Sequence, residues 1–174
     1  MACLGVHFAI TAELAERLTR DRPLSNTEVV ALLKDLDRQF NALHAEGCVQ
    51  MTDKAWDGIH RSLTDGKLEP GNTPRHLCIL GATERFWVRR EDGELGYIVN
   101  LLEPVDVRRV ADAIRGIDRG ELLRGYEGID PDSFYALCMS EDDFEYTWDN
   151  FQGLRAFFER AAAAARWVVF KVDQ

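Results

Sequence analysis

The feature that most constrains the fold of this chain is a one-sided helical stripe that begins at Ser25. The apolar residues that follow recur every three or four positions, namely Val29, Leu32, Leu33, Leu36, Phe40 and Leu43. That spacing places them on one face of an amphipathic helix. Ser25 and Glu28 have the spacing of a capping box, in which each side chain accepts a hydrogen bond from the backbone amide of the other residue. We therefore predict one helix from Ser25 to about Ala45, ended by Gly47.

Other helix starts carry local signals of the same kind. A threonine hydroxyl suits a helix cap, and proline suits a first helical turn because its missing amide is not needed there. Acidic residues after Ser140 favour a helix start because they complement the helix dipole. The predicted helices begin at Thr11, Thr52, Pro104, Glu121, Pro131 and Ser140. The last is the longest, and its apolar face consists of Phe144, Trp148, Phe151 and Phe158.

Short apolar runs between these helices indicate strands. They cover residues 3–10, 76–81, 85–90 and 166–172. Residues 89–102 resemble a hairpin, because Asp92 and Gly93 supply the backbone angles of a two-residue turn. A chain of 174 residues is long enough to bury a substantial core. We predict a single α+β domain over residues 1–174, with a small, mostly antiparallel central sheet and helices packed around it.

The dipeptide Trp-Asp occurs twice, at residues 56 and 148, and indicates an internal duplication. A helix start precedes the pair by 45 residues in the first half and by 44 in the second. A strand-like run follows each tryptophan by 20 residues. The candidate repeats, residues 4–80 and 97–172, are two β-helices-β units. This reasoning predicts that Trp56 and Trp148 are buried at corresponding places.

Charge and apolar patterning narrow the class of protein. The chain has 21 basic and 30 acidic residues, for a net charge of -9, and its basic residues are scattered. A nucleic-acid interface needs a concentrated basic face, so we expect no nucleic-acid partner. We expect neither a signal peptide nor a membrane span, since no apolar run has the required length. Four widely spaced cysteines without a CxxC pair are consistent with a cytoplasmic protein with reduced thiols.

Several segments together resemble the YfbM-like family of small bacterial proteins. They are DKAWDGIHRSLT, TPRHLCILGA and YIVNLLEPVDVRRVADAI, with the closing helix and strand. The most specific matches are the Trp-Asp-x-x-His segment and the Leu-Gly pair at residues 80 and 81. The resemblance implies an α+β domain with one sheet and surrounding helices. Because the family has no known function, it implies no catalytic residues. The chain departs from the family pattern at Arg75 and His76, where the strand entry is more polar.

Trp56, Asp57 and His60 form the sharpest candidate for catalysis. On a helix, residue 60 lies on the same face as residues 56 and 57. An aspartate that orients an imidazole beside an aromatic wall would make a general base of fixed tautomer. The alternative is that the segment is a helix start with a core tryptophan. The second Trp-Asp pair favours this alternative, because Gln152 stands where the first copy has His60.

Weaker candidates involve cysteine. Cys78 with His60 or His76 would form a nucleophile and base, because His76 and Cys78 would share one side of the predicted strand. The apolar neighbours of Cys78 instead favour a buried, inert thiol. His44 and Cys48 have helical spacing for two zinc ligands, but the sequence nominates no third ligand. We expect no metal site and no cofactor, since no glycine-rich phosphate loop, GxSxG or HExxH motif occurs.

Two segments suggest a binding surface. The run EDDFEYTWD at residues 141–149 alternates acidic with aromatic side chains, as a protein-binding patch would. Its alternative interpretation is a helix start whose aromatic residues belong to the core. The loop-like segment before it offers Tyr126, Asp130, Asp132 and Tyr135 as contact residues for an interface or pocket.

Two classes of function follow from these observations. The first is a small acidic cytoplasmic binding module that recognises another protein, in an immunity-like or regulatory role. Its binding residues would be Trp56 and the four residues of the loop-like segment. The second is a hydrolase-like enzyme acting on a small molecule, with Asp57 as orienter, His60 as base, and Trp56 or Tyr135 as a pocket wall. The absence of a complete catalytic motif favours the first class. The sequence indicates no oligomeric state.

Overall fold

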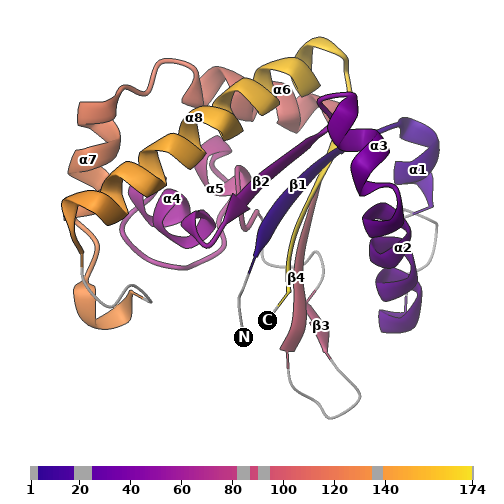
Figure 1. Cartoon of the computed structure of the whole chain (residues 1–174), viewed down its shortest axis with the longest axis horizontal. Helices are drawn as coiled ribbons and strands as arrows, with labels where there is room; N and C mark the ends of the chain where they lie inside the picture. The colour runs from indigo at the N-terminus through magenta and orange to yellow at the C-terminus, as the bar shows by residue number, and fades with distance from the viewer. Residues whose placement is uncertain (1–3, 18–24, 82–86, 90–94, 135–138, 174) are drawn as a thin grey trace.

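The computed structural model describes residues 4–17, 25–81, 87–89, 95–134 and 139–173. Within these ranges, five strands form one sheet in the order β2-β1-β5-β4-β3 (Figure 1). The strands are β1 Gly5–Ile10, β2 Val49–Asp53, β3 Trp87–Arg89, β4 Leu95–Leu102 and β5 Trp167–Asp173. All neighbouring strands are antiparallel. The predicted α+β class with an antiparallel central sheet is therefore confirmed.

Helices cover both faces of the sheet. They are α1 Ala12–Glu16, α2 Asn26–Arg38, α3 Phe40–Ala45, α4 Ala55–Leu63, α5 Pro74–Leu77, α6 Pro104–Ile114, α7 Arg119–Glu127 and α8 Glu141–Ala163, with the 3-10 turn η1 Pro131–Ser133. The helices α1 to α3 lie on one side of the strands and α4 to α8 on the other (Figure 1). The buried apolar residues accordingly form two clusters, one on each face.

Strand β5 shows why alternation is weak in the central strands. Val168 and Phe170 belong to the cluster under α8, whereas Val169 belongs to the cluster under α2. All three side chains are at most 1% exposed. A strand that is covered on both faces is apolar at nearly every position, so the run WVVFKV, interrupted only by Lys171, does not alternate.

The predicted helix starts that depend on near neighbours are confirmed. Thr11 accepts a hydrogen bond from the amide of Leu14, and Ser140 accepts one from the amide of Asp143. The capping box at Ser25 is complete, with both reciprocal hydrogen bonds formed. Helix α6 begins at Pro104 as predicted. Each of these starts is set by residues within one helical turn, which the sequence shows directly.

The region between residues 39 and 55 differs from the prediction in two ways. The single helix expected from Ser25 is two helices, α2 and α3, separated at Gln39. Thr52 was expected to cap a helix, but it lies in strand β2, where its buried hydroxyl donates to the carbonyl oxygen of Gly5 at 3.2 Å. Helix α4 then begins at Ala55 without a side-chain cap of its own. The hydroxyl of Tyr146 supplies that cap, accepting from the amide of Lys54 at 3.2 Å.

The strand predicted at residues 76–81 is wrong. The segment is the short helix α5, capped by Thr73, followed by a turn. Its apolar side chains are buried. Its backbone bonds to a side chain of β4, because the Asn100 amide donates to the carbonyl oxygens of Leu77 and Ile79 at 3.0 and 3.1 Å. The first candidate repeat therefore lacks the closing strand that β5 provides in the second.

The segment around residues 116–137 is more helical than its glycines indicate. Helix α7 covers nine residues rather than the four predicted. Gly125 lies inside it because α4 passes so close that a Cβ atom there would collide with the carbonyl oxygen of Ser62. The helical turn at Pro131 is confirmed as η1. Tyr135 and the expected turn at Asp92 and Gly93 lie outside the described residues.

No helix in the parts of the chain that the structure describes is long and apolar enough to span a membrane.

Candidate functional site

Trp56 is a core residue at the start of α4. Its side chain is 4% exposed, and its ring packs on Phe170 of β5 with 6.1 Å between ring centroids. A large aromatic side chain buried in this way stabilises the fold through the apolar area that it removes from water. Trp56 therefore anchors α4 to the sheet rather than lining an open site.

Asp57 forms a buried ion pair with Arg61, which lies one helical turn further along α4. The Nε atom of Arg61 donates to Oδ1 of Asp57 at 2.6 Å, and both side chains are less than a tenth exposed. The same guanidinium donates to the carbonyl oxygen of Gly66 at 3.1 Å and to that of Ser133 at 2.9 Å. Burial raises the pKa of Asp57, while the hydrogen bond from Arg61 opposes that shift. The pair thus clamps two turns of the chain against α4.

His60 is fully buried and does not contact Asp57. Its Nε2 atom lies 2.9 Å from the carbonyl oxygen of Glu69, to which it donates, and Nδ1 has no hydrogen-bond partner. The ring of His76 packs edge-on against it, with the centroids 5.7 Å apart. Burial lowers the pKa of His60 to about 4. The imidazole is neutral near pH 7, and the Asp-His contact that a general base would need is not formed.

A second buried imidazole, His7 of β1, gave no sequence signal. It lies among the rings of Phe157, Phe158 and Phe170. Its Nε2 atom is 3.1 Å from the carbonyl oxygen of Cys78, and burial lowers its pKa to about 4. Because this hydrogen bond links β1 to a turn 71 residues away, only the fold reveals it.

The cysteine candidates do not have the settings that their proposed roles require. Cys78 is 1% exposed, and burial raises the pKa of its thiol, which disfavours the reactive thiolate. His76 and Cys78 do not share a strand face, because that strand is absent. The ring of His44 stacks on Phe40. Within the described ranges, no three His, Cys, Asp or Glu side chains are grouped to hold a metal ion around His44 and Cys48 or elsewhere.

The second Trp-Asp pair has a different setting from the first. Trp148 is half-buried and packs on Phe151, with the guanidinium of Arg155 5.9 Å from its ring centroid. Asp149 is exposed and accepts from the side chain of Gln152. Trp148 lies well inside α8, whereas Trp56 is the second residue of α4. The expectation that both tryptophans occupy corresponding buried places is therefore wrong.

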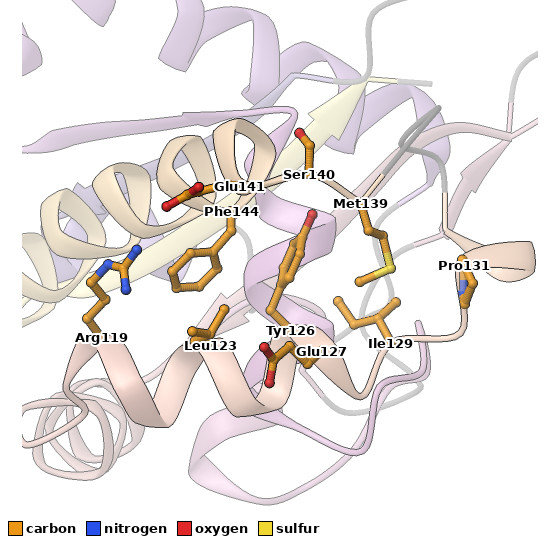
Figure 2. Close-up of a pocket in the computed structure, with 10 residues that line it drawn as sticks. All are labelled: Arg119, Leu123, Tyr126, Glu127, Ile129, Pro131, Met139, Ser140, Glu141 and Phe144. Atoms are coloured by element: carbon orange, nitrogen blue, oxygen red, sulfur yellow. The ribbon is translucent and has the colours of Figure 1, made fainter.

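A cavity lies elsewhere, between α7 and the start of α8. We call it the α7–α8 groove; its volume is about 560 Å³ (Figure 2). It is lined by Arg119, Leu123, Tyr126, Glu127, Ile129, Pro131, Met139, Ser140, Glu141 and Phe144. The lining residues belong to two described segments, residues 119–131 and 139–144.

Aromatic side chains form the floor of the groove. Tyr126 and Phe144 are 3% and 2% exposed, and their ring centroids are 5.4 Å apart. The hydroxyl of Tyr126 donates to the carboxylate of Asp143 at 2.5 Å, which fixes the ring relative to α8. Leu123 and Met139 are half-buried and leave apolar atoms at the surface. The groove therefore offers a rigid floor with exposed apolar walls.

The mouth of the groove carries charge. Arg119 is paired with Glu145, and its guanidinium lies over the ring of Phe144 at 5.0 Å from the centroid. Glu127 and Glu141 are both exposed and come from α7 and α8, on opposite sides of the groove (Figure 2). Neither of these two carboxylates forms a hydrogen bond or ion pair with another described residue. The lining thus combines one neutralised cation with two uncompensated anions.

The structure brings together part of the predicted binding surface. Tyr126 lines the groove, while Asp130 and Asp132 are exposed on either side of Pro131, which also lines it. Asp130 additionally caps η1 by accepting from the amide of Asp132 at 3.1 Å. Trp56 does not line the groove and is a buried core residue of α4.

The acidic and aromatic run at residues 141–149 is a helix start whose Phe144 belongs to the core, as its alternative interpretation predicts. Glu141 and Phe144 also line the groove. Sequence reasoning missed Arg119, Leu123, Glu127, Ile129 and Met139. The spacing of residues 119, 123 and 127 on one helix face is a signal that would have indicated the first three.

Comparison with known proteins defines the family. The sequence matches the family described as a domain of unknown function, DUF1877, over residues 1–171. The chain belongs to this family. The crystal structure of YfbM, a protein of unknown function from Escherichia coli, is similar, with a TM-score of 0.65 and 16% sequence identity. The match covers 97% of this chain and 99% of that chain. It shows a shared fold and confirms the resemblance, while no curated protein matches the sequence.

Proposed function

We propose that this DUF1877 member is a cytoplasmic binding module that recognises another protein through the α7–α8 groove, in a regulatory or immunity-like role. The observation that carries this proposal is the combination, in one cavity, of a fixed aromatic floor, exposed apolar walls and uncompensated carboxylates. Protein-binding sites gain most of their affinity from apolar and aromatic side chains that bind in a pocket, and their specificity from polar groups around it.

The size and charge of the molecule support this role. A cavity of about 560 Å³ is within the range of sites that accept a few side chains or a small ligand. The net charge of -9 would steer a basic partner toward the protein and accelerate association at low ionic strength. The exposed groups around the groove add to this field, since Asp130, Asp132 and Asp142 are all exposed nearby in the sequence.

The enzyme hypothesis has less support from the geometry. Its orienter, Asp57, is bound to Arg61, and its base, His60, donates to a backbone carbonyl inside the fold. Neither residue lines the α7–α8 groove or the smaller cavity beside Asn100. A catalytic pair needs a reacting group within hydrogen-bond reach of its base, and neither of these two cavities reaches Asp57 or His60.

Site-specific photo-cross-linking tests the proposal. The photoreactive residue p-benzoylphenylalanine would replace Leu123 in the groove or, as a control, Val105, which is 62% exposed on α6 toward the other end of α8. We expect position 123, and not position 105, to cross-link one partner protein in native lysate. Capture should be lost with Glu127→Arg in the same bait and retained with Arg108→Glu on α6. Equal cross-linking from both positions, or none from position 123, would contradict the proposal.

A further inference from the structure

The charges at the mouth of the α7–α8 groove do not cancel. Three residues of its lining are acidic or basic, namely Arg119, Glu127 and Glu141. Arg119 is neutralised by Glu145, which lies outside the lining. Glu127 and Glu141 have no ion-pair partner within the described part of the chain. Two negative charges therefore remain on the groove, one on each wall.

The groups next to Glu141 in the first turn of α8 are also acidic. Asp142 and Asp143 belong to the first turn of α8 next to Glu141, and Asp143 is already an acceptor for Tyr126. The helix dipole stabilises acidic residues in that turn without removing their charge. A ligand group placed between α7 and α8 would consequently meet a negative potential from both sides.

Arg119 already packs its guanidinium on the aromatic floor of the groove. Its guanidinium lies over the face of Phe144 and is paired with a carboxylate of α8. Arginine is suited to such a place, since it combines a planar cation with an apolar stem that packs on hydrophobic walls. The rest of the groove also combines apolar side chains with carboxylates. Leu123 and Met139 are its walls, and Glu127 and Glu141 are carboxylates without a cation.

We infer that the α7–α8 groove binds an arginine or lysine side chain of its partner, with Glu127 and Glu141 as counter-ions and Leu123 and Met139 contacting the apolar residue next to it. This inference rests on the proposed function and specifies the chemistry of the partner segment. An acidic segment would place like charges against both carboxylates and is excluded by the same potential. The overall charge of the molecule favours the same class of partner.

Short peptides test the inference directly. The isotopically labelled protein would be titrated with acetyl-Leu-Arg-Leu-amide while its backbone amide signals are followed by NMR. Two matched peptides replace arginine by citrulline, its uncharged analogue, or by glutamate. We expect shifts at Leu123, Glu127 and Glu141 with the arginine peptide, affinity about fivefold lower with citrulline, and no binding of the glutamate peptide.

Protein variants separate local from global charge. Glu127→Gln with Glu141→Gln should reduce the affinity for the arginine peptide about fivefold. The control, Glu13→Gln with Glu16→Gln on α1, removes the same charge from exposed positions on the other face of the sheet and should leave the affinity unchanged. An equal loss with the control would overturn the inference, because overall charge would then explain the binding.

The outcomes also distinguish this inference from the proposed function. If the arginine and citrulline peptides both shift the groove signals and bind with equal affinity, cation recognition is refuted, while a peptide-binding groove is supported. Shifts that map outside the groove, or no shifts with any of the three peptides, would overturn both. Groove shifts that require the cation and both glutamates support both.

Discussion

The ion pair of Asp57 and Arg61 explains what the first Trp-Asp dipeptide contributes. The carboxylate is buried, so it needs a cation and hydrogen bonds to remain in the fold. Arg61 supplies both and extends them to the backbone at Gly66 and Ser133. Trp56 fixes the same helix to the sheet. These residues therefore have a structural role at the start of α4. The second Trp-Asp pair already favoured this interpretation over catalysis.

Removing one partner of this pair should destabilise the protein more than removing both. We expect Arg61→Met to lower the free energy of unfolding by about 3 to 5 kcal/mol, because it leaves the Asp57 carboxylate buried without a cation. The double variant Asp57→Leu with Arg61→Met should cost less than Arg61→Met alone, because it leaves no buried charge without a partner. Denaturant unfolding monitored by circular dichroism measures both variants. A loss under about 1 kcal/mol for Arg61→Met would show that the pair is not an effective clamp.

At the level of whole elements, α4 depends on groups that are remote in sequence. Tyr146 of α8 caps its first turn, and Gly125 of α7 allows the two helices to approach at Ser62. Alanine normally stabilises a helix interior by about 1 kcal/mol relative to glycine. At position 125 the close approach should reverse that sign, because the added methyl group would force α4 and α7 apart.

Two glycine substitutions therefore have opposite expected effects. Gly125→Ala should lower the free energy of unfolding by about 2 kcal/mol or more, as overpacking does in a dense core. Gly116→Ala is the matched control, since a Cβ atom there meets nothing within 4 Å. It should be neutral or stabilising by about 0.5 kcal/mol. Thermal unfolding of both variants compares them. Similar melting temperatures would mean that α4 and α7 can separate without cost.

The sequence could predict those elements whose defining hydrogen bonds join residues close together in the chain. The caps at Thr11, Ser25 and Ser140 involve residues three positions apart, so their signals are visible in the sequence. The short strand β2 and the turn after α5 depend instead on hydrogen bonds to Gly5 and from Asn100. These contacts span 47 and 23 residues, and no local pattern encodes them.

Some residues of the α7–α8 groove could likewise be predicted from the sequence, and others could not. Tyr126 was predicted as a contact residue because its segment is loop-like, and the start of α8 because it alternates acidic with aromatic side chains. The walls of the groove were not, because a leucine or methionine becomes a binding surface only when two helices leave it half-buried. The catalytic role of Asp57 and His60 stays a prediction without the contact it requires.

Taken as a whole, the molecule encloses two imidazoles between the sheet and the helices of its larger core. His7 and His60 are both fully buried, and each has one ring nitrogen without a partner. In the unfolded chain both would titrate at the ordinary histidine pKa of 6.5, whereas in the fold burial lowers each pKa to about 4. Between these two values the unfolded chain binds protons that the folded chain does not.

The protein should therefore lose stability as the pH falls below about 6.5. Because the unfolded state binds more protons in this window, the free energy of unfolding rises with pH, and the full contribution is present above pH 6.5. From pH 6 to pH 5 each histidine should lower it by about 1 kcal/mol. Denaturant unfolding across this range measures the slope. His60→Gln retains a donor for Glu69 and should reduce the slope by one histidine's share, whereas parallel curves for the variant and the native protein would show that His60 is not buried as a neutral group.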